Sequence, residues 1–259
     1  MNNSCVYLVG AGPGDPELLT VKALRLIEAA DVVVYDRLVS DEIIELIPVG
    51  VAKIYVGKAT GRHSLPQDEI NTLLLNLAKG HRHIVRLKGG DPFIFGRGSE
   101  EAVVLAQHNI KFEIIPGITS AMACAAYAGI PLTHRGLADG VRFITGHRRS
   151  DLELEFDLGA FSDKNCTLAI YMGLSNLEPI VNAVLNAGRH VSTPVAVIEQ
   201  GTTSQQRQII SCLSDLITDT KAAGIEPPAM VVIGDVVSLA KTLDWFEPAI
   251  EQQLQQSTA

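Results

Sequence analysis

The chain has 259 residues, 47% of them hydrophobic, and a formal net charge of −8 at pH 7. This length and apolar content suffice for one large hydrophobic core or two smaller ones, and the acidic charge argues against nucleic acid as a partner. No stretch approaches the ~20 apolar residues of a membrane span, and the first residues, MNNSCVYLVG, lack the pattern of a signal peptide.

The four cysteines are scattered along the chain and form no C-x-x-C pair. Such spacing favours reduced thiols over a disulfide framework or a zinc site, so we expect a cytoplasmic protein. The histidines of the HRH stretch, His81 and His83, have no apparent third ligand nearby. We therefore expect no metal site.

The first half of the sequence alternates between strand and helix patterns. Near-continuous apolar runs, which are typical of buried parallel strands, are followed by segments with helical periodicity. This alternation predicts a doubly wound α/β domain with a five-stranded parallel sheet. The predicted strands cover 5–10, 31–36, 52–58, 83–91 and 111–117, and the predicted helices cover 16–30, 40–47, 65–80 and 98–109.

The regular alternation of strand and helix patterns ends after residue 117, and a helix rich in small residues is expected over 118–131. Two later strand patterns, 193–200 and 207–213, are joined by a polar turn and predict antiparallel pairing, hence a mixed sheet. We expect an N-terminal α/β domain over 1–116, a C-terminal α/β domain over 117–248 and a loosely ordered tail over 249–259. The other predicted strands of the second half are 141–147, 166–173 and 229–237, and its other helices are 176–188 and 213–224.

The turn in LVGAGPGDPELLT, residues 8–20, resembles a dinucleotide-binding fingerprint but departs from it. Gly10 and Gly12 fit the G-x-G-x-x-G pattern, whereas Asp15 occupies the position of the third glycine. Asp15 is suited to capping a helix that begins at Pro16, and an acidic cap disfavours phosphate. The turn therefore predicts a rigid, extended backbone cradle for a ligand other than a dinucleotide.

Several polar residues follow predicted strands and should meet at the carboxyl edge of the sheet, where open α/β sheets bind ligands. Asp36 follows the second strand and Lys58 the third, and a Gly-Asp-Pro triplet occurs at both 14–16 and 90–92. Taken singly, Asp36 suits a turn and Lys58 a solvated surface; together they suit an acid–base pair.

Cationic residues gather near the same turns of an acidic protein, which predicts a local pocket for a polyanion. For each residue alone, a solvated position at the edge is the simpler interpretation. Arg97 and Arg135 are the strongest candidates because neighbouring glycines leave room for a ligand. The cations are Arg37, Lys58, Arg62, His63, Lys88, Arg97, His134, Arg135, His147, Arg148 and Arg149.

Long motifs in a fixed order carry a resemblance to a known family. The stretches VYLVGAGPGDPELLTVKALRLIEAADVVVYDRLVS, VGK, RLKGGDPFIFGRGSEE, IPGITSAMACAAYAGIPLTHRG and YMG resemble the tetrapyrrole methylase family over nearly the whole chain. The resemblance implies S-adenosylmethionine as cofactor, held between two α/β domains of a homodimer. We expect a stand-alone enzyme, without the dehydrogenase and chelatase domains that are fused to it in some relatives.

The same resemblance implies roles for individual residues. Asp36 matches the proton acceptor and Lys58 the proton donor, while Arg37, Arg97, His134 and Arg135 would hold substrate carboxylates. Gly201, Ala229 and Met230 are matched through the shorter motifs of the second half. The implied cofactor contacts are Pro13, Gly89, Gly90, Asp91, Ile94, Thr119, Ser120, Met172, Gly201, Ala229 and Met230.

The implied reaction is the transfer of two methyl groups to pyrrole carbons of uroporphyrinogen III, which gives precorrin-2 for sirohaem or cobalamin synthesis. Three alternatives stay open. The chain could methylate a later precorrin, or modify RNA, although its charge argues against the latter. It could also bind S-adenosylmethionine without catalysis, a role that does not require Asp36 and Lys58 together.

Overall fold

The computed structural model describes residues 4–57, 65–146 and 158–248. The chain divides into two compact units, Met1–Ser120 and Ala121–Ala259. The predicted domains, 1–116 and 117–248, stay a prediction about which parts of the chain fold independently. The predicted tail, 249–259, lies outside the described residues.

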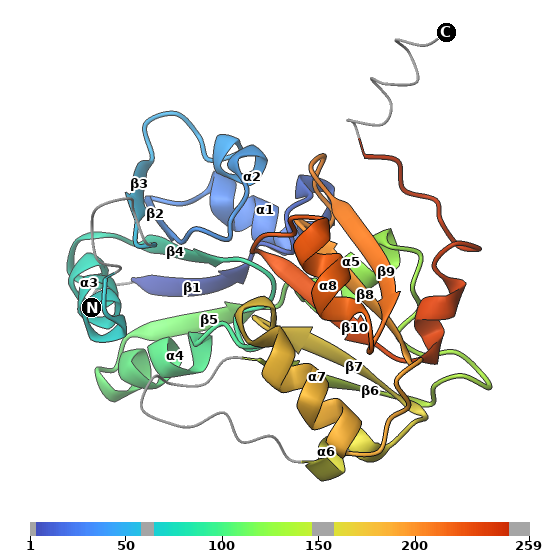
Figure 1. The fold of residues 1–259 in the computed structure, drawn as a ribbon. Helices are drawn as coiled ribbons and strands as arrows, with labels where there is room; N and C mark the ends of the chain where they lie inside the picture. Colours follow the sequence, from blue (N-terminus) through green and yellow to red (C-terminus); the bar gives the residue numbers. More distant parts are fainter. Residues whose placement is uncertain (1–3, 58–64, 147–157, 249–259) are drawn as a thin grey trace, which may run out of the picture. The chain divides into compact units, whose positions relative to one another are not determined.

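Unit 1 is built on a five-stranded sheet with the order β3-β2-β4-β1-β5 (Figure 1). Every neighbouring pair of strands runs parallel, which confirms the predicted doubly wound sheet. Its strands are β1 (Cys5–Gly10), β2 (Val32–Tyr35), β3 (Ala52–Tyr55), β4 (His83–Lys88) and β5 (Lys111–Ile115), and its helices are α1 (Val21–Glu28), α2 (Asp41–Glu45), α3 (Gln67–Gly80) and α4 (Gly98–Gln107).

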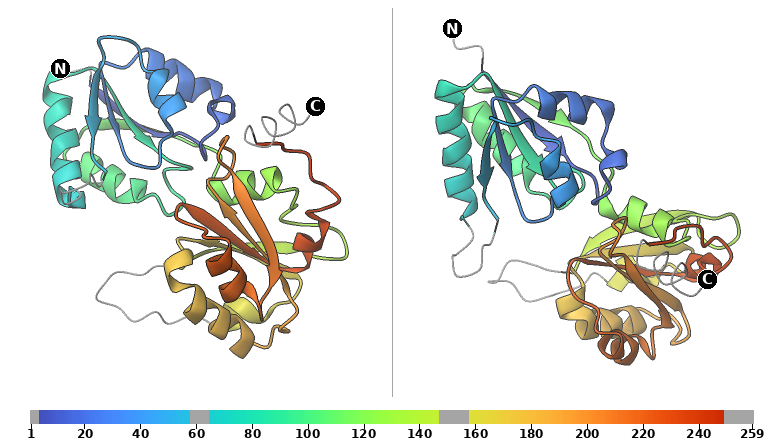
Figure 2. Two further views of the ribbon diagram at one scale, coloured as in Figure 1. Left: turned by 45° about the horizontal axis from the view of Figure 1, so that its top comes forward. Right: turned by 90° about the horizontal axis from the view of Figure 1, so that it is seen from above.

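Helices cover both faces of this sheet (Figure 2). Alternate residues of a strand point to opposite faces, so Val33 packs with α1 and α2, whereas Val32 and Val34 pack with α3 and α4. All three valines are fully buried. Burial on both faces explains why the strands read as continuous apolar runs rather than as alternating ones.

The helix predicted over 16–30 is wrong in its first part. A 3₁₀ turn, Pro16–Leu18, comes first, Leu19 is extended, and α1 begins only at Val21. Thr20 causes the new start, because its hydroxyl accepts a hydrogen bond of 3.1 Å from the backbone N–H of Ala23. Helix α3 ends at Gly80, as predicted, but it begins at Gln67 rather than at residue 65.

Unit 2 contains a second five-stranded sheet with the order β6-β7-β10-β8-β9. The β6–β7 pair is parallel and the other three pairs are antiparallel, which confirms the mixed sheet and the pairing of β8 with β9. Its strands are β6 (Gly140–Thr145), β7 (Cys166–Tyr171), β8 (Pro194–Glu199), β9 (Arg207–Cys212) and β10 (Ala229–Ile233), and its helices are α6 (Leu158–Ser162), α7 (Leu177–Asn186) and α8 (Leu216–Ala222).

The core of unit 2 lies between its sheet and α6, α7 and α8. Ile180 and Val184 of α7 are fully buried there beside Phe161 of α6, a helix that the sequence patterns do not predict. None of the helices formed by the described residues has the length and apolar content of a membrane span.

Helix α5 (Ser120–Tyr127) crosses the division between the units and is shorter than the predicted 118–131. It ends because Gly129 adopts a φ of +67°, a conformation that glycine tolerates best. A Cβ atom there would lie 2.8 Å from the carbonyl oxygens of Ala240 and Leu243, so the C-terminal segment packs directly against this turn.

Candidate functional site

Three glycines bring the loops after β1, β4 and β5 into direct backbone contact; we call them the glycine junction (Gly10, Gly90 and Gly117). A Cβ atom on Gly10 would lie 2.5 Å from the amide nitrogen of Gly117, and one on Gly117 would lie 2.4 Å from the carbonyl oxygen of Gly90. Gly12 and Gly90 exchange backbone hydrogen bonds of 3.1 and 2.6 Å. The three loops therefore form one continuous backbone surface at the carboxyl edge of the sheet.

Asp91, in the loop after β4, stabilises this surface by accepting hydrogen bonds from two backbone N–H groups. Its Oδ1 accepts a hydrogen bond of 2.8 Å from the N–H of Phe93, and its Oδ2 accepts one of 3.1 Å from the N–H of Gly117. Ser120 lies alongside, since a Cβ atom on Gly90 would be 3.4 Å from its hydroxyl oxygen. Gly90, Asp91 and Ser120, predicted as cofactor contacts, are thus brought together, with the buried Thr119 and the half-buried Ile94 adjacent in the chain.

The turn after β1 has the predicted cap. Asp15 accepts a hydrogen bond of 2.8 Å from the N–H of Glu17, and Pro16 stands at the start of the 3₁₀ turn. The expectation of an extended Gly12 is wrong, because its φ is +73°. Pro13 follows in a half-buried position. The turn offers backbone and a carboxylate, not the long helix N-terminus on which a pyrophosphate binds.

Asp36 stands at the same edge, directly after β2. Its side chain is 26% exposed. Its Oδ1 accepts a hydrogen bond of 3.1 Å from the N–H of Leu38, and its Oδ2 accepts one of 3.2 Å from Nη2 of Arg86. The loop after β4 packs on this turn, because a Cβ atom on Gly89 would lie 2.6 Å from Cβ of Leu38. Asp36 therefore lies beside the glycine junction with its carboxylate oriented.

The predicted cationic cluster is wrong in including Lys88, because this side chain is buried and paired. It is 3% exposed, and its Nζ lies 3.0 Å from Oε1 of Glu101, which is fully buried. Arg86, also 3% exposed, places its Nε 3.1 Å from the same oxygen. Burial lowers the pKa of Lys88, and the neighbouring Arg86 lowers it further, against the opposite influence of Glu101. Lys88 is thus an interior charge and not a ligand for a polyanion.

Sequence reasoning missed Arg86 and Glu101. Arg86 has mainly apolar neighbours in the sequence. One weak signal was available: Arg86 and Lys88 are two residues apart in one strand, so their side chains point to the same face of the sheet. Their acidic partner lies on α4, which the spacing alone does not identify.

The remaining predicted cations occupy exposed positions. Arg37 and Arg97 are exposed in unit 1, and His134 and Arg135 are exposed in a tight turn of unit 2. Arg97 has a φ of +59° and makes two hydrogen bonds, of 2.7 and 2.8 Å, with Glu100, which raise its pKa. Outside the described residues lie Lys58, Arg62, His63, His147, Arg148 and Arg149.

The predicted cofactor contacts of unit 2 lie at strand ends. Met172 follows β7 with a φ of +54° and is 50% exposed, and Ala229 and Met230 begin β10. Gly201 packs against α5 so closely that a Cβ atom would lie 2.4 Å from Sγ of Cys124. Left-handed non-glycine residues such as Met172 are costly and are concentrated at functional sites.

The HRH stretch has structural contacts. The carboxylate of Asp31 accepts hydrogen bonds of 2.7 and 2.9 Å from the N–H groups of Arg82 and His83, which lower the pKa of Asp31. The ring of His83 stacks on Tyr7 at 6.0 Å between centroids. Within 4–57, 65–146 and 158–248, no group of three or more His, Cys, Asp or Glu side chains could hold a metal ion.

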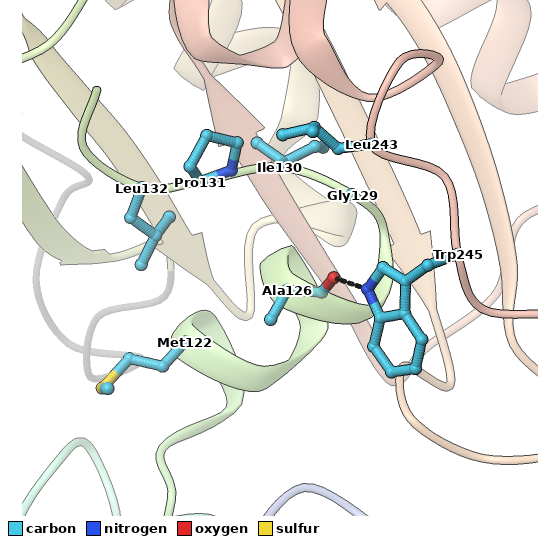
Figure 3. Close-up of a pocket in the computed structure, with 8 residues that line it drawn as sticks. All are labelled: Met122, Ala126, Gly129, Ile130, Pro131, Leu132, Leu243 and Trp245. Atoms are coloured by element: carbon cyan, nitrogen blue, oxygen red, sulfur yellow. Dashed lines mark hydrogen bonds between the residues drawn. The ribbon is translucent and has the colours of Figure 1, made fainter. Parts of the chain in front are cut away.

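An apolar groove of about 500 Å³ lies in unit 2 between α5, the turn that follows it and the C-terminal segment (Figure 3). Trp245 closes one side, its Nε1 donating a hydrogen bond of 2.9 Å to the carbonyl of Ala126. None of the predicted site residues lines it. The lining residues are Met122, Ala126, Gly129, Ile130, Pro131, Leu132, Leu243 and Trp245.

Fold and site together define a two-unit α/β protein whose candidate binding edge presents backbone and carboxylates rather than a phosphate cradle. Residues 5–217 match the model of the family Tetrapyrrole (Corrin/Porphyrin) Methylases. The chain belongs to this family.

Solved structures and curated sequences give the same result. The uroporphyrin-III C-methyl transferase of Thermus thermophilus, complexed with S-adenyl homocysteine, is 41% identical; the match covers 91% of this chain and 100% of that one, with a TM-score of 0.78. A cobalt precorrin-4 methyltransferase is 31% identical, covering 91% and 96% of the two chains, with a TM-score of 0.80. The siroheme synthase of Saccharophagus degradans is 50% identical over 242 residues, which are 93% of this chain and 53% of that protein. The chain thus spans about half the length of the curated relatives it matches.

The glycine junction predicts a steric penalty at Gly117. In Gly117→Ala the new methyl group would meet backbone atoms that cannot move independently, so the free energy of unfolding should fall by about 1–3 kcal/mol. Urea denaturation would measure it. The matched control is Gly80→Ala, at the end of α3 with nothing within 4 Å, which should change stability by no more than about 1 kcal/mol. Equal stability of the two variants would contradict the tight contact.

The contact between Gly201 and α5 predicts an unreactive Cys124. Burial raises the pKa of this thiol to about 12. At pH 8 its thiolate should therefore be about a thousandfold scarcer than that of an ordinary cysteine, and labelling by a thiol reagent correspondingly slow. Peptide mass spectrometry after timed labelling would compare Cys124 with the half-buried Cys212, and denatured protein serves as the reference. Similar labelling rates at the two sites in the folded protein would refute this expectation.

Proposed function

We propose that this protein transfers methyl groups from S-adenosylmethionine to two pyrrole carbons of uroporphyrinogen III, giving precorrin-2. The observation that carries the proposal is the oriented carboxylate of Asp36 beside the glycine junction, in a chain 41% identical to the named transferase over that protein's full length. The siroheme synthase relatives support sirohaem synthesis as the destination of the product.

The residues of the glycine junction fit such a cofactor. S-adenosylmethionine has a nucleoside and a cationic sulfonium but no phosphate, so it suits an edge of closely packed glycine backbone, with Gly89 and Gly117 half-buried beside the carboxylate of Asp91. The acidic cap Asp15, which would oppose a pyrophosphate, is compatible with it. In unit 1, we assign the cofactor contacts to Pro13, Gly89, Gly90, Asp91, Ile94, Thr119 and Ser120, and in unit 2 to Met172, Gly201, Ala229 and Met230.

When bound, the cofactor supplies a methyl group activated towards attack by an electron-rich carbon. Such a transfer requires alignment more than a covalent nucleophile on the protein. The methylated ring carbon carries no hydrogen, so the protein must instead remove the proton that becomes acidic elsewhere on the methylated macrocycle. Asp36 is placed to accept it, because hydrogen bonds orient its carboxylate and 26% of the side chain is exposed. We assign proton donation to Lys58.

The exposed cations would hold the substrate's carboxylates. Arg37 follows Asp36 directly, and His134 and Arg135 are exposed in their turn. Arg97 is already paired with Glu100 through the Nε–Nη2 edge of its guanidinium, so a substrate carboxylate must compete with Glu100 for that edge. We therefore assign the main charge recognition to Arg37, His134 and Arg135, and a secondary part to Arg97.

A second candidate is the methylation of a later precorrin, which the 31% identity to a cobalt precorrin-4 methyltransferase favours. We also propose that the protein is a cytoplasmic homodimer that uses neither nucleic acid nor a membrane as partner. Light scattering on a sizing column would measure the oligomeric state, and a monomer would refute this part.

The function is tested by anaerobic incubation with S-adenosylmethionine and either uroporphyrinogen III or precorrin-2. Mass spectrometry of the tetrapyrrole should show two added methyl groups with uroporphyrinogen III and none with precorrin-2. Methylation of precorrin-2 alone would favour the second candidate. Methylation of cobalt precorrin-4, added as a third substrate, would likewise favour the second candidate. Binding of the cofactor without methylation of any of the three compounds would indicate a non-catalytic protein.

The role of Asp36 predicts a separation between catalysis and cofactor binding. Asp36→Asn keeps the hydrogen bond to Leu38 but removes the base, so kcat should fall by about 10²–10⁴-fold. The Kd for S-adenosylhomocysteine, measured by calorimetry, should stay within about twofold of wild type, which is a small change in binding free energy. Parallel losses of kcat and affinity would mean that Asp36 is structural.

A further inference from the structure

A chain of four charged side chains links the interior of unit 1 to its functional edge; we call it the charge chain (Lys88, Glu101, Arg86 and Asp36). Lys88 and Arg86 both contact Oε1 of Glu101, at 3.0 and 3.1 Å, and Arg86 reaches Asp36 at 3.2 Å. We propose that Arg86 is a positioning residue that orients the Asp36 carboxylate, and that Glu101 holds Arg86 in place. This inference rests on the proposed function, because it gives Asp36 its purpose.

The backbone register brings the two side chains together. Arg86 of β4 is paired with Val34 of β2, and Asp36 follows two residues later on the same face of the sheet. The guanidinium then uses all three nitrogens: Nε donates to Glu101, Nη1 to the carbonyl of Leu87 and Nη2 to Asp36. Each contact fixes a different direction, so the planar group has one orientation.

Burial makes this orientation rigid. Arg86 is 3% exposed and Glu101 is fully buried, so neither charge can exchange its partner for water. Losing one partner of a buried pair is strongly unfavourable. The Oε1 atom of Glu101 also accepts a hydrogen bond of 3.2 Å from Gln67. The interior end of the chain is therefore anchored, and only its outer end, Asp36, is partly open to solvent.

A purely structural role explains the chain less well. Buried ion pairs are weak contributors to stability compared with apolar side chains of the same volume. Lys88, Glu101 and Arg86 alone have one positive charge in excess, which Asp36 neutralises; charge balance, however, requires no fixed geometry, whereas the Asp36 carboxylate is held at both oxygens. The Leu38 N–H binds Oδ1 of Asp36 and Arg86 binds Oδ2, so both oxygens are fixed while other lone pairs can accept a proton.

The variant Arg86→Lys tests whether Arg86 orients Asp36 in addition to pairing with Glu101. An ammonium can pair with Glu101 but cannot present three donors in a fixed plane, so Asp36 should lose its partner while the buried charge is kept. Small misplacements of catalytic groups cost up to about 10²-fold. We expect kcat to fall by about 10- to 100-fold, and KM for S-adenosylmethionine to change by no more than about twofold.

The decisive measurement combines Arg86→Lys with Asp36→Asn. If Arg86 acts through Asp36, the double variant should be no slower than Asp36→Asn alone, because residues that act as a unit are not additive. The matched control is Arg189→Lys, a second buried arginine, which binds the backbone carbonyls of Phe161 and Cys166 in unit 2. It should lower the Tm but leave kcat within about twofold of wild type.

Two results would overturn the inference: a folded Arg86→Lys protein with wild-type kcat, or a double variant in which the two losses multiply. If Arg86→Lys does not fold, Arg86→Gln replaces it, since it leaves the buried Lys88–Glu101 pair electrically balanced while Asp36 loses its charged partner. Crystal structures supply a readout that needs no activity: the Asp36 carboxylate should leave its wild-type position in the variant, and an unchanged position would refute the inference. Absence of methyl transfer by the wild type would refute the proposed function alone.

Discussion

The backbone contact among Gly10, Gly90 and Gly117 is the constraint on which the functional edge of unit 1 depends. Loops after strands are ordinarily the most variable parts of an α/β unit. Here the loops after β1, β4 and β5 approach to distances at which no side chain fits between them. The hydrogen bond from Gly117 to Asp91 and the exchange between Gly12 and Gly90 then complete a single surface. Every candidate contact in this unit lies on or beside it.

The cationic side chains near the functional edge differ in their partners and in their exposure. The sequence shows one group of cations near the turns, but the structure separates them by partner. Lys88 is an interior charge bound to Glu101, and Arg97 is paired with Glu100. The exposed Arg37, His134 and Arg135 have the accessibility that recognition of carboxylates requires. In an acidic protein, exposed cations create local positive potential, which suits the proposed polyanionic substrate.

A sequence-based prediction succeeded where the responsible interaction leaves a clear pattern in neighbouring residues, and failed where that pattern is short or is overlaid by another. The parallel strands were predictable because burial on both faces makes each an apolar run, and Asp15 was predictable as a cap because capping involves adjacent residues. The start of α1 was mispredicted although its cause is also local: Thr20 competes as a cap within a segment whose apolar periodicity continues through it. Helix α6, with five residues, is too short for periodicity to reveal.

The sequence by itself determined the order of the strands and of every α-helix in the described residues except α6, the departure of the first turn from a dinucleotide fingerprint, and the family, since these reside in contiguous residues. Only the tertiary structure decided which of these residues meet. Gly10 and Gly117 are far apart in the chain, and Arg86 acquires its partners from β2 and α4 through the pairing of strands and the packing of a helix. Residue spacing records which face a side chain occupies, but strand order and helix packing determine what it touches.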